Sequence, residues 1–305
     1  MMRRVVLSSL ILILVILGIL IVIRPLNLAV FRGEDCVYTF NFFVDRTLQP
    51  IVEEAARRFS SELEREGCRA EFRYVYGSSG FVLSQLILTK SGDLYVSDDF
   101  TFARKAVIEG HVYRDSVIIT GYIQLAIFTV EGNPLGIKGL KDLLFNRSKL
   151  IVAVGDPTHV AAGLLAKELL TAITYVDPVT GVNKTYWDIL HERHNVIYAF
   201  SAFDAFNRAK LGAVDASLTF DVFNYLDPRG VTMIPIEPEV NVRAAPIVWA
   251  IPVYTKQRNI MERFLSLVAS DDMIEYARNL GFRTIDDMKV IAPYAKLPTL
   301  EDIVG

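Results

Sequence analysis

The chain has 305 residues, of which 52% are hydrophobic and 22% are charged, and its formal net charge is −3. Beyond residue 36, 28 Lys and Arg residues stand against 33 Asp and Glu residues, so the composition disfavours a nucleic-acid binder, which needs a basic surface. The only two cysteines, Cys36 and Cys68, exclude both a thiolate metal cluster and a disulfide-dense scaffold.

Residues 1–36 are expected to form an N-terminal membrane anchor or signal segment. Residues 5–23 carry no charge and follow Arg3 and Arg4, and 19 helical residues suffice to span a bilayer core of about 30 Å. We expect an uncleaved anchor rather than a cleaved signal, because the apolar stretch is long and lacks a convincing small-x-small site. The positive-inside rule then places the remaining chain outside the cell membrane, extracellular or periplasmic.

The pattern after residue 36 alternates strands and helices. Residues 37–43 predict a strand, residues 50–65 an amphipathic helix and residues 70–76 the next strand. Cys36 and Cys68 open these two strands, so if the strands are parallel neighbours a disulfide is geometrically reasonable, and we expect one. Two unpaired thiols are the alternative.

Two long apolar runs, residues 117–130 and 246–254, bracket a central block of alternating strands and helices. Both are expected to be strands that cross between two parts of the molecule. The pattern therefore predicts an α/β fold in which one domain is inserted into another, each with a mostly parallel sheet flanked by helices.

Five motifs then appear in a fixed order, and together they resemble the periplasmic molybdate-binding proteins of ABC importers from about residue 37 to residue 282. They are Gly77-Ser78-Ser79-Gly80, Asp93-Leu94-Tyr95-Val96-Ser97-Asp98-Asp99, Gly132-Asn133-Pro134, Val154-Gly155-Asp156-Pro157-Thr158-His159-Val160-Ala161-Ala162-Gly163, and Gly212-Ala213-Val214-Asp215-Ala216. The resemblance implies a two-lobed periplasmic-binding-protein fold. Lobe I would contain residues 37–124 and 249–305, and lobe II would contain residues 125–248.

The resemblance also implies a function. The protein would capture a tetrahedral oxyanion, molybdate or tungstate, and deliver it to an ABC permease as a monomer, without a cofactor or a resident metal and without enzymatic activity. Sulfate or another small anion is the alternative ligand. An extracellular enzyme on the same scaffold, using His191 and His194, is a third interpretation.

Several residues correspond to the ligand positions of that family. Ser79 matches a binding serine, Ala162 matches a backbone donor, and Thr47 takes the place of the serine in the first motif. Ala202 would supply a further backbone donor, and Phe220 stands where the family has a binding tyrosine. We expect Phe220 to line the cleft and the hydroxyl and amide of Ser79 to donate to the anion.

Helix N-termini explain why such turns can hold an anion, since their unpaired N–H groups and the helix dipole both favour negative charge. Ser78 belongs to this set through its place before the expected helix at Phe81, although plain helix capping is the alternative role for both serines. Arg46 could add a positive charge beside Thr47. Archaeal relatives carry two acids where this chain has Val160 and Thr219, which leaves the identity of the oxyanion open.

Other polar clusters are weaker candidates for a functional site. His191 and His194 are three residues apart, whereas zinc proteases space their histidines by four, so a solvated helix end is the simpler interpretation. Adjacent acids could form acid–base pairs at Asp98-Asp99, Asp271-Asp272 and Asp286-Asp287. Neighbouring residues on a helix point about 100° apart, so we expect no catalysis there.

Overall fold

The computed structural model describes residues 36–178 and 180–305. Within these residues, no helix combines the length and apolar character that crossing a membrane requires. The expected anchor at residues 5–23 lies outside the described part of the chain and stays a prediction. Residues Tyr38–Gly305 form one compact unit, which contains both five-stranded sheets except for Cys36 and Val37.

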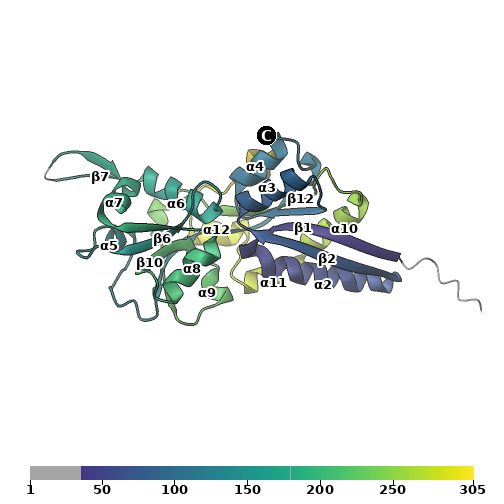
Figure 1. Cartoon of the computed structure of the whole chain (residues 1–305), viewed down its shortest axis with the longest axis horizontal. Helices are drawn as coiled ribbons and strands as arrows, with labels where there is room; N and C mark the ends of the chain where they lie inside the picture. Colours follow the sequence, from purple (N-terminus) through teal and green to yellow (C-terminus); the bar gives the residue numbers. More distant parts are fainter. Residues whose placement is uncertain (1–35, 179) are drawn as a thin grey trace, which may run out of the picture. The chain divides into compact units, whose positions relative to one another are not determined.

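The first sheet has five strands in the order β2-β1-β3-β12-β4. These strands are β1 (Cys36–Asp45), β2 (Cys68–Gly77), β3 (Leu94–Ser97), β4 (Ile118–Ile123) and β12 (Ala245–Ala250). Strands β1, β2 and β12 are labelled in Figure 1. β1 and β3 are parallel, with Val44 beside Val96, whereas β12 runs antiparallel to both β3 and β4. The sheet is therefore mixed, with β12 reversed relative to its neighbours.

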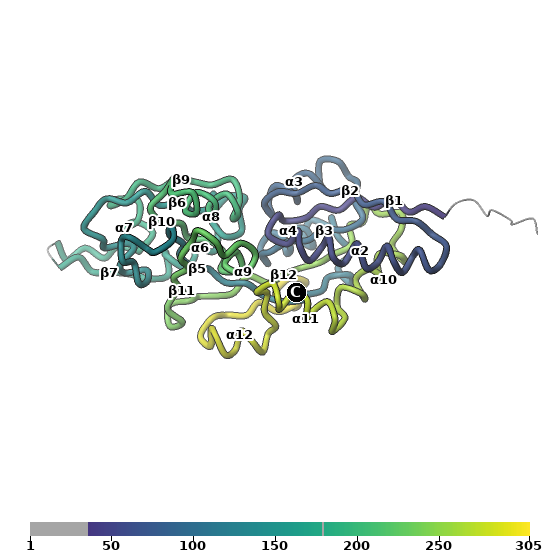
Figure 2. Tube along the Cα trace, turned by 90° about the horizontal axis from the view of Figure 1, so that it is seen from below, coloured from purple at the N-terminus to yellow at the C-terminus, as the bar shows by residue number. Residues whose placement is uncertain are grey.

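Helices pack on both faces of this sheet. They are α2 (Gln49–Arg65), α3 (Ser79–Thr89), α4 (Phe100–Ile108), α10 (Arg258–Val268), α11 (Asp271–Asn279), α12 (Ile285–Ile291) and α13 (Leu300–Val304), with short 3-10 turns η1 (Arg46–Leu48) and η2 (Arg114–Ser116). Phe42 joins the hydrophobic cluster under α2 and α10, and Phe43 joins the cluster under α3 and α4. Because successive strand side chains point to opposite faces, the adjacent residues Phe42 and Phe43 of β1 serve the two clusters. The C-terminal helices return to this half of the molecule, where α11 contacts α2, α12 contacts β4 and α13 contacts α4. Figure 2 shows α11 and α12 beside each other in the C-terminal, yellow part of the chain.

The second sheet has five strands in the order β11-β5-β10-β6-β9. These are β5 (Leu125–Val130), β6 (Ile151–Gly155), β9 (Asn195–Ala199), β10 (Ala216–Phe220) and β11 (Val231–Pro235). β10, β6 and β9 are parallel, and β5 runs antiparallel to β10 and β11. Its other elements are α5 (Leu140–Leu144), α6 (Ala161–Ala172), α7 (Tyr186–Arg193), α8 (Ala202–Lys210), α9 (Phe223–Leu226), η3 (Pro238–Val240) and the hairpin of β7 (Thr174–Val176) and β8 (Asn183–Thr185).

The chain crosses between the sheets at two places. The run at residues 117–130 makes the first crossing, as predicted, although as two strands, whereas the second crossing differs from the prediction. The apolar run at residues 117–130 is divided at Gln124 into β4 and β5, which belong to different sheets. β12 lies wholly in the first sheet, so the second crossing is made by residues 236–244 instead of residues 246–254. The reason is that Gln124 has its own hydrogen bonds at the crossing: its carbonyl accepts from Asp221 N (2.9 Å) and its Oε1 accepts from Asn241 Nδ2 (3.0 Å).

Neither cysteine of the described chain is free, and both Cys36 and Cys68 are disulfide-bonded. Since the sequence contains no other cysteine, the bond joins these two residues, as predicted. Each of them is the first residue of its strand, and β1 and β2 are neighbours in the sheet.

Candidate functional site

The start of α3 is the centre of the candidate site. Ser78 precedes the helix in an extended conformation, and the first turn is closed by Val82 N donating to Ser78 O (2.9 Å). Its side chain makes no capping hydrogen bond, and its buried Oγ has no hydrogen-bond partner among the described residues. Gly80 N donates to His159 O (3.0 Å), which lies in the turn before α6. The same helix start therefore contacts the half of the molecule built on the second sheet.

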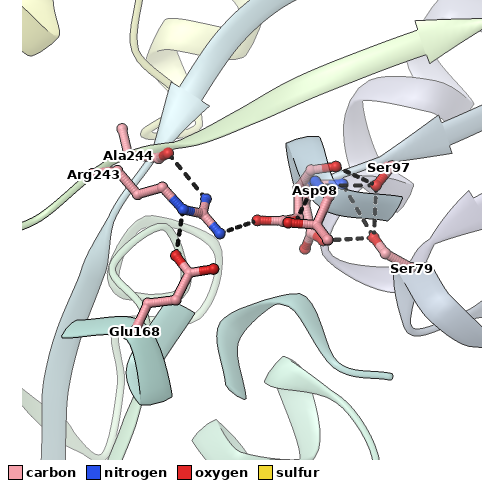
Figure 3. A network of polar contacts seen from close by, with 8 residues as sticks. Ser79, Ser97, Asp98, Glu168, Arg243 and Ala244 are labelled. Carbon is pink, nitrogen blue, oxygen red and sulfur yellow. Dashed lines mark hydrogen bonds and ion pairs between the residues drawn. The ribbon is translucent and has the colours of Figure 1, made fainter. Parts of the chain in front are cut away.

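The hydroxyl of Ser79 lies between two carboxyl groups. Ser79 Oγ is 2.7 Å from Asp98 Oδ1, and it accepts from Asp98 N (3.2 Å) and Ser97 Oγ (3.1 Å) (Figure 3). It also lies 2.9 Å from Asp45 Oδ2. A hydroxyl has one proton, so Ser79 can donate to only one carboxyl group at a time. The hydroxyl predicted to bind an anion is engaged with the chain's own acids.

Asp45 also accepts a hydrogen bond from the backbone amide of Thr47, the residue whose hydroxyl was expected to reach the ligand. It is the last residue of β1 and caps η1, where its Oδ1 accepts from Thr47 N (2.9 Å). Asp45 and Thr47 are both buried. Each carboxylate oxygen of Asp45 is thus aimed at a residue that the sequence assigned to the ligand.

Burial governs the protonation of the two acids. Removal from water raises the pKa of Asp45. It also raises the pKa of Asp98 well above its ordinary value, and the negative charge of Asp45 raises it further. Burial disfavours the charged form of a carboxyl group, and two adjacent carboxylates cannot both ionise without strong repulsion. The pair therefore shares a proton over a range of pH in which exposed aspartates are ionised.

Arg243 neutralises the third buried acid of the site. Its Nη2 lies 2.7 Å from Asp99 Oδ2, at the start of α4, and its Nε lies 2.6 Å from Glu168 Oε2, on α6 (Figure 3). The guanidinium carbon also lies 4.9 Å from the ring centre of Phe100. Because Arg243 belongs to the crossing segment 236–244, one side chain pairs with an acid from each half of the molecule.

Arg46 marks a second contact between the halves. Its guanidinium carbon is 5.8 Å from the ring centre of Tyr76, at the end of β2, and 5.9 Å from that of Phe203, in α8. Arg46 itself is exposed, whereas its neighbours Asp45 and Thr47 are buried. The turns before α2 and α3 thus meet the starts of α6 and α8, as expected for a site between two lobes.

Three predicted site residues lie on the second half. Ala162 is buried in the first turn of α6, and Ala202 is the first residue of α8, where its carbonyl accepts from Thr219 Oγ1 (3.0 Å). Phe220 ends β10 with no exposed surface and packs in the main hydrophobic core, and its expected place in the cleft stays a prediction. Gly163 has a packing role, because a Cβ there would lie 2.0 Å from the carbonyl oxygen of Gly155 in β6.

Residues 40–283 match the family model described as bacterial extracellular solute-binding protein. The chain belongs to this family. A search of curated proteins gave no match.

Solved structures with the same fold include three binding proteins. The sulfate-binding protein SubI from Mycobacterium tuberculosis has a TM-score of 0.71 at 16% identity, covering 88% of this chain and 96% of that one. The periplasmic molybdate-binding protein of Azotobacter vinelandii has a TM-score of 0.65 at 15% identity, covering 80% and 98%. The substrate-binding domain of a putative molybdenum ABC transporter from Clostridium difficile has a TM-score of 0.56 at 16% identity, covering 82% and 99%. These similarities confirm the two-lobed periplasmic-binding-protein fold.

The histidines that suggested an enzyme have structural roles in this solute-binding protein. His194 is buried, with Nδ1 accepting from Leu150 N (3.1 Å) and Nε2 3.0 Å from Leu144 O. His191 lies 2.8 Å from Trp187 O and 2.9 Å from Tyr198 Oη through its two ring nitrogens. No group of three or more metal-ligating side chains occurs in residues 36–178 and 180–305.

Sequence reasoning missed the pairing of Asp45 with Asp98. The signal was present, because both acids follow apolar strands that the structure shows to be parallel neighbours, with Val44 beside Val96. The carboxyl ends of parallel strands meet at one edge of the sheet, so the acids that follow them converge. In the sequence Asp98 is adjacent to Asp99, so the sequence suggested a pair of these two neighbours instead of the distant pair of Asp98 with Asp45.

Proposed function

We propose that this solute-binding protein captures a small tetrahedral oxyanion between its lobes and delivers it to the permease of an ABC importer. Molybdate and tungstate are the first candidates, and sulfate is the alternative. The observation that carries the proposal is the meeting of Ser78 and Ser79, at the start of α3, with the turn before α6 through Gly80 N and His159 O. Helix starts supply oriented N–H groups to anions without a formal positive charge.

The organisation of the chain completes the proposal. The first lobe would end at Gln124 and resume at β12, so the boundary expected at residues 248/249 would move to about residue 245. Residues 5–23 would anchor the chain with both lobes outside the cell, and the protein would act as a monomer without catalytic activity.

The test is titration of the full chain, purified in detergent micelles, against molybdate, tungstate and sulfate by calorimetry at several pH values. We expect saturable binding of one oxyanion per chain, with molybdate or tungstate preferred. Native mass spectrometry of the same samples checks the stoichiometry and the monomeric state. Absence of binding to every oxyanion, at every pH and in the variants described below, would exclude this ligand class.

A further inference from the structure

We propose that Asp45 and Asp98 make oxyanion capture proton-coupled, so that the site binds a fully deprotonated oxyanion only together with one additional proton. The inference rests on the proposed function and specifies which form of the site accepts the anion. Asp45 and Asp98 then determine specificity, because they decide whether the donors around Ser79 are available.

An oxyanion at this site competes with the carboxyl groups of Asp45 and Asp98 for the same hydrogen-bond donors. An oxyanion at the start of α3 needs the hydroxyl of Ser79 and the amide of Thr47, but both lie against the carboxylate oxygens of Asp45 and Asp98 at 2.7–2.9 Å. A bare carboxylate beside the bound anion would also repel it in a buried, low-dielectric position. A protonated carboxyl group removes both obstacles, because it carries no charge and its O–H is itself a donor.

Two buried side-chain oxygens near Ser79 have hydrogen-bonding capacity that the described residues do not use. Asp98 Oδ2 is buried and has no hydrogen-bond partner among the described residues, although the carboxyl groups of Asp98 and Asp45 both reach Ser79 Oγ, at 2.7 and 2.9 Å. The buried Ser78 Oγ also has no partner in the described part of the chain. With a shared proton the pair keeps one negative charge, and a second proton makes both acids neutral donors.

Among the described residues, no positively charged side chain is paired with Asp45 or Asp98. Tyr95, from β3, faces the acids and stays neutral, because burial raises its pKa. Asp99 is paired with Arg243. Across the lobe contact, the His159 ring is directed to Asp156 (3.8 Å), and the Arg46 guanidinium lies over aromatic rings. A proton is therefore the counter-charge that this site can take up.

The experiment measures molybdate and sulfate binding to the full chain by calorimetry from pH 8 to pH 5, in buffers of different ionisation enthalpy. Sulfate is included because its charge stays constant over this range. We expect uptake of about one proton per bound anion and an affinity that rises by up to about tenfold for each unit of falling pH, since a coupled proton shifts log K by at most one per pH unit. This readout needs no variant.

Substitutions separate this inference from the proposed function. Asp45→Asn together with Asp98→Asn replaces both acids by neutral side chains of the same shape, so this double variant should bind oxyanions more tightly than the wild type at pH 8 and with little pH dependence. Asp98→Asn alone leaves the carboxyl group of Asp45 beside Ser79 Oγ, so the single variant should keep the pH dependence. Asp271→Asn with Asp272→Asn removes two exposed charges at the start of α11 and should leave the pH dependence unchanged.

Each outcome has one meaning. Wild-type binding that is equally tight from pH 8 to pH 5, without proton uptake, would overturn the proton coupling and leave the proposed function intact. Failure of the wild type and of the folded Asn variants to bind any oxyanion would overturn both.

Discussion

A single hydroxyl, that of Ser79, lies at 2.7 and 2.9 Å from two carboxyl oxygens that come from different strands. Asp45 is the last residue of β1, and Asp98 directly follows the neighbouring parallel strand β3. The two aspartate side chains therefore start from the same edge of the sheet and reach the same hydroxyl. The residues around Ser79 therefore differ from the binding site expected from the sequence. The difference lies in acids placed next to the expected donors, since the donors themselves are present.

Substitution of Phe220 tests whether the ligand positions inferred from the family resemblance apply to this chain. We expect Phe220→Tyr to leave oxyanion affinity unchanged and to lower the free energy of unfolding by about 1–3 kcal/mol, because the added hydroxyl enters a fully buried position in the hydrophobic core. Chemical denaturation and calorimetric titration measure the two quantities. Phe200→Tyr, at a side chain with 77% exposure, is the control and should change neither. Tighter binding by Phe220→Tyr would return this position to the binding site.

Individual residues of the site were predictable to different degrees. Thr47 and Ser79 could be found because a hydroxyl residue before a helix is a local pattern that a sequence displays. The approach of Asp45 to Asp98 spans 53 residues and depends on which strands are neighbours, which no local pattern specifies. The burial of Phe220 depends in the same way on helices that pack from elsewhere in the chain.

At the scale of elements, the start of α3 has two roles. Ser79 contacts the acid pair, and Gly80 packs against the turn before α6 so closely that a Cβ would lie 2.8 Å from His159 Cα. Glycine is required here by the close approach, since Gly80 is not among the residues with positive φ.

Gly80→Ala should therefore weaken ligand binding by about tenfold or more. Alanine is a better helix former than glycine, so α3 itself gains stability, but the methyl group must displace the backbone of His159. Titration with the bound oxyanion measures the effect. Ser84→Ala, one turn later in α3, removes only a hydroxyl that donates to Gly80 O and should leave affinity unchanged. Equal affinities of Gly80→Ala and the wild type would show that the lobes bind ligand without this contact.

Element prediction succeeded where hydrophobic periodicity changed and failed where it did not. The strand–helix–strand unit from β1 to β2 was readable because α2 is amphipathic and the strands are not. Residues 117–130 contain no turn signal, so the break at Gln124 was invisible, although its hydrogen bonds to Asp221 and Asn241 fix it in the structure.

In the whole molecule, Arg243 connects the crossing segment to both lobes. Asp99, on the first lobe, has no exposed side-chain surface, and Glu168, on the second, is partly exposed. A buried ion pair contributes little net stability compared with an apolar replacement, but loss of one partner leaves an uncompensated charge.

Arg243→Met should lower the free energy of unfolding by about 3–5 kcal/mol, as observed when one partner of a buried ion pair is removed. The added substitution Asp99→Asn should recover part of this loss, because asparagine keeps the cap on Thr101 N and carries no charge. Arg263→Met breaks an ion pair with Glu66 in which both side chains are largely exposed, and should cost less than about 1 kcal/mol. Urea unfolding of the four proteins measures these differences. Similar losses for Arg243→Met and Arg263→Met would contradict a buried interlobe ion pair.

The adjacency of Ser79 and Gly80 has a kinetic consequence. One peptide unit connects the residue that contacts the acid pair with the residue whose N–H reaches the other lobe. In the proposed site, a movement of this helix start that frees the anion would also break the hydrogen bond between Gly80 N and His159 O. Dissociation of the anion then requires separation of the lobes, so this contact determines the residence time of the bound anion. The rate at which the anion and the protein meet depends on diffusion. A long residence time suits scavenging from dilute surroundings, and the receiving transporter must shorten it by pulling the lobes apart.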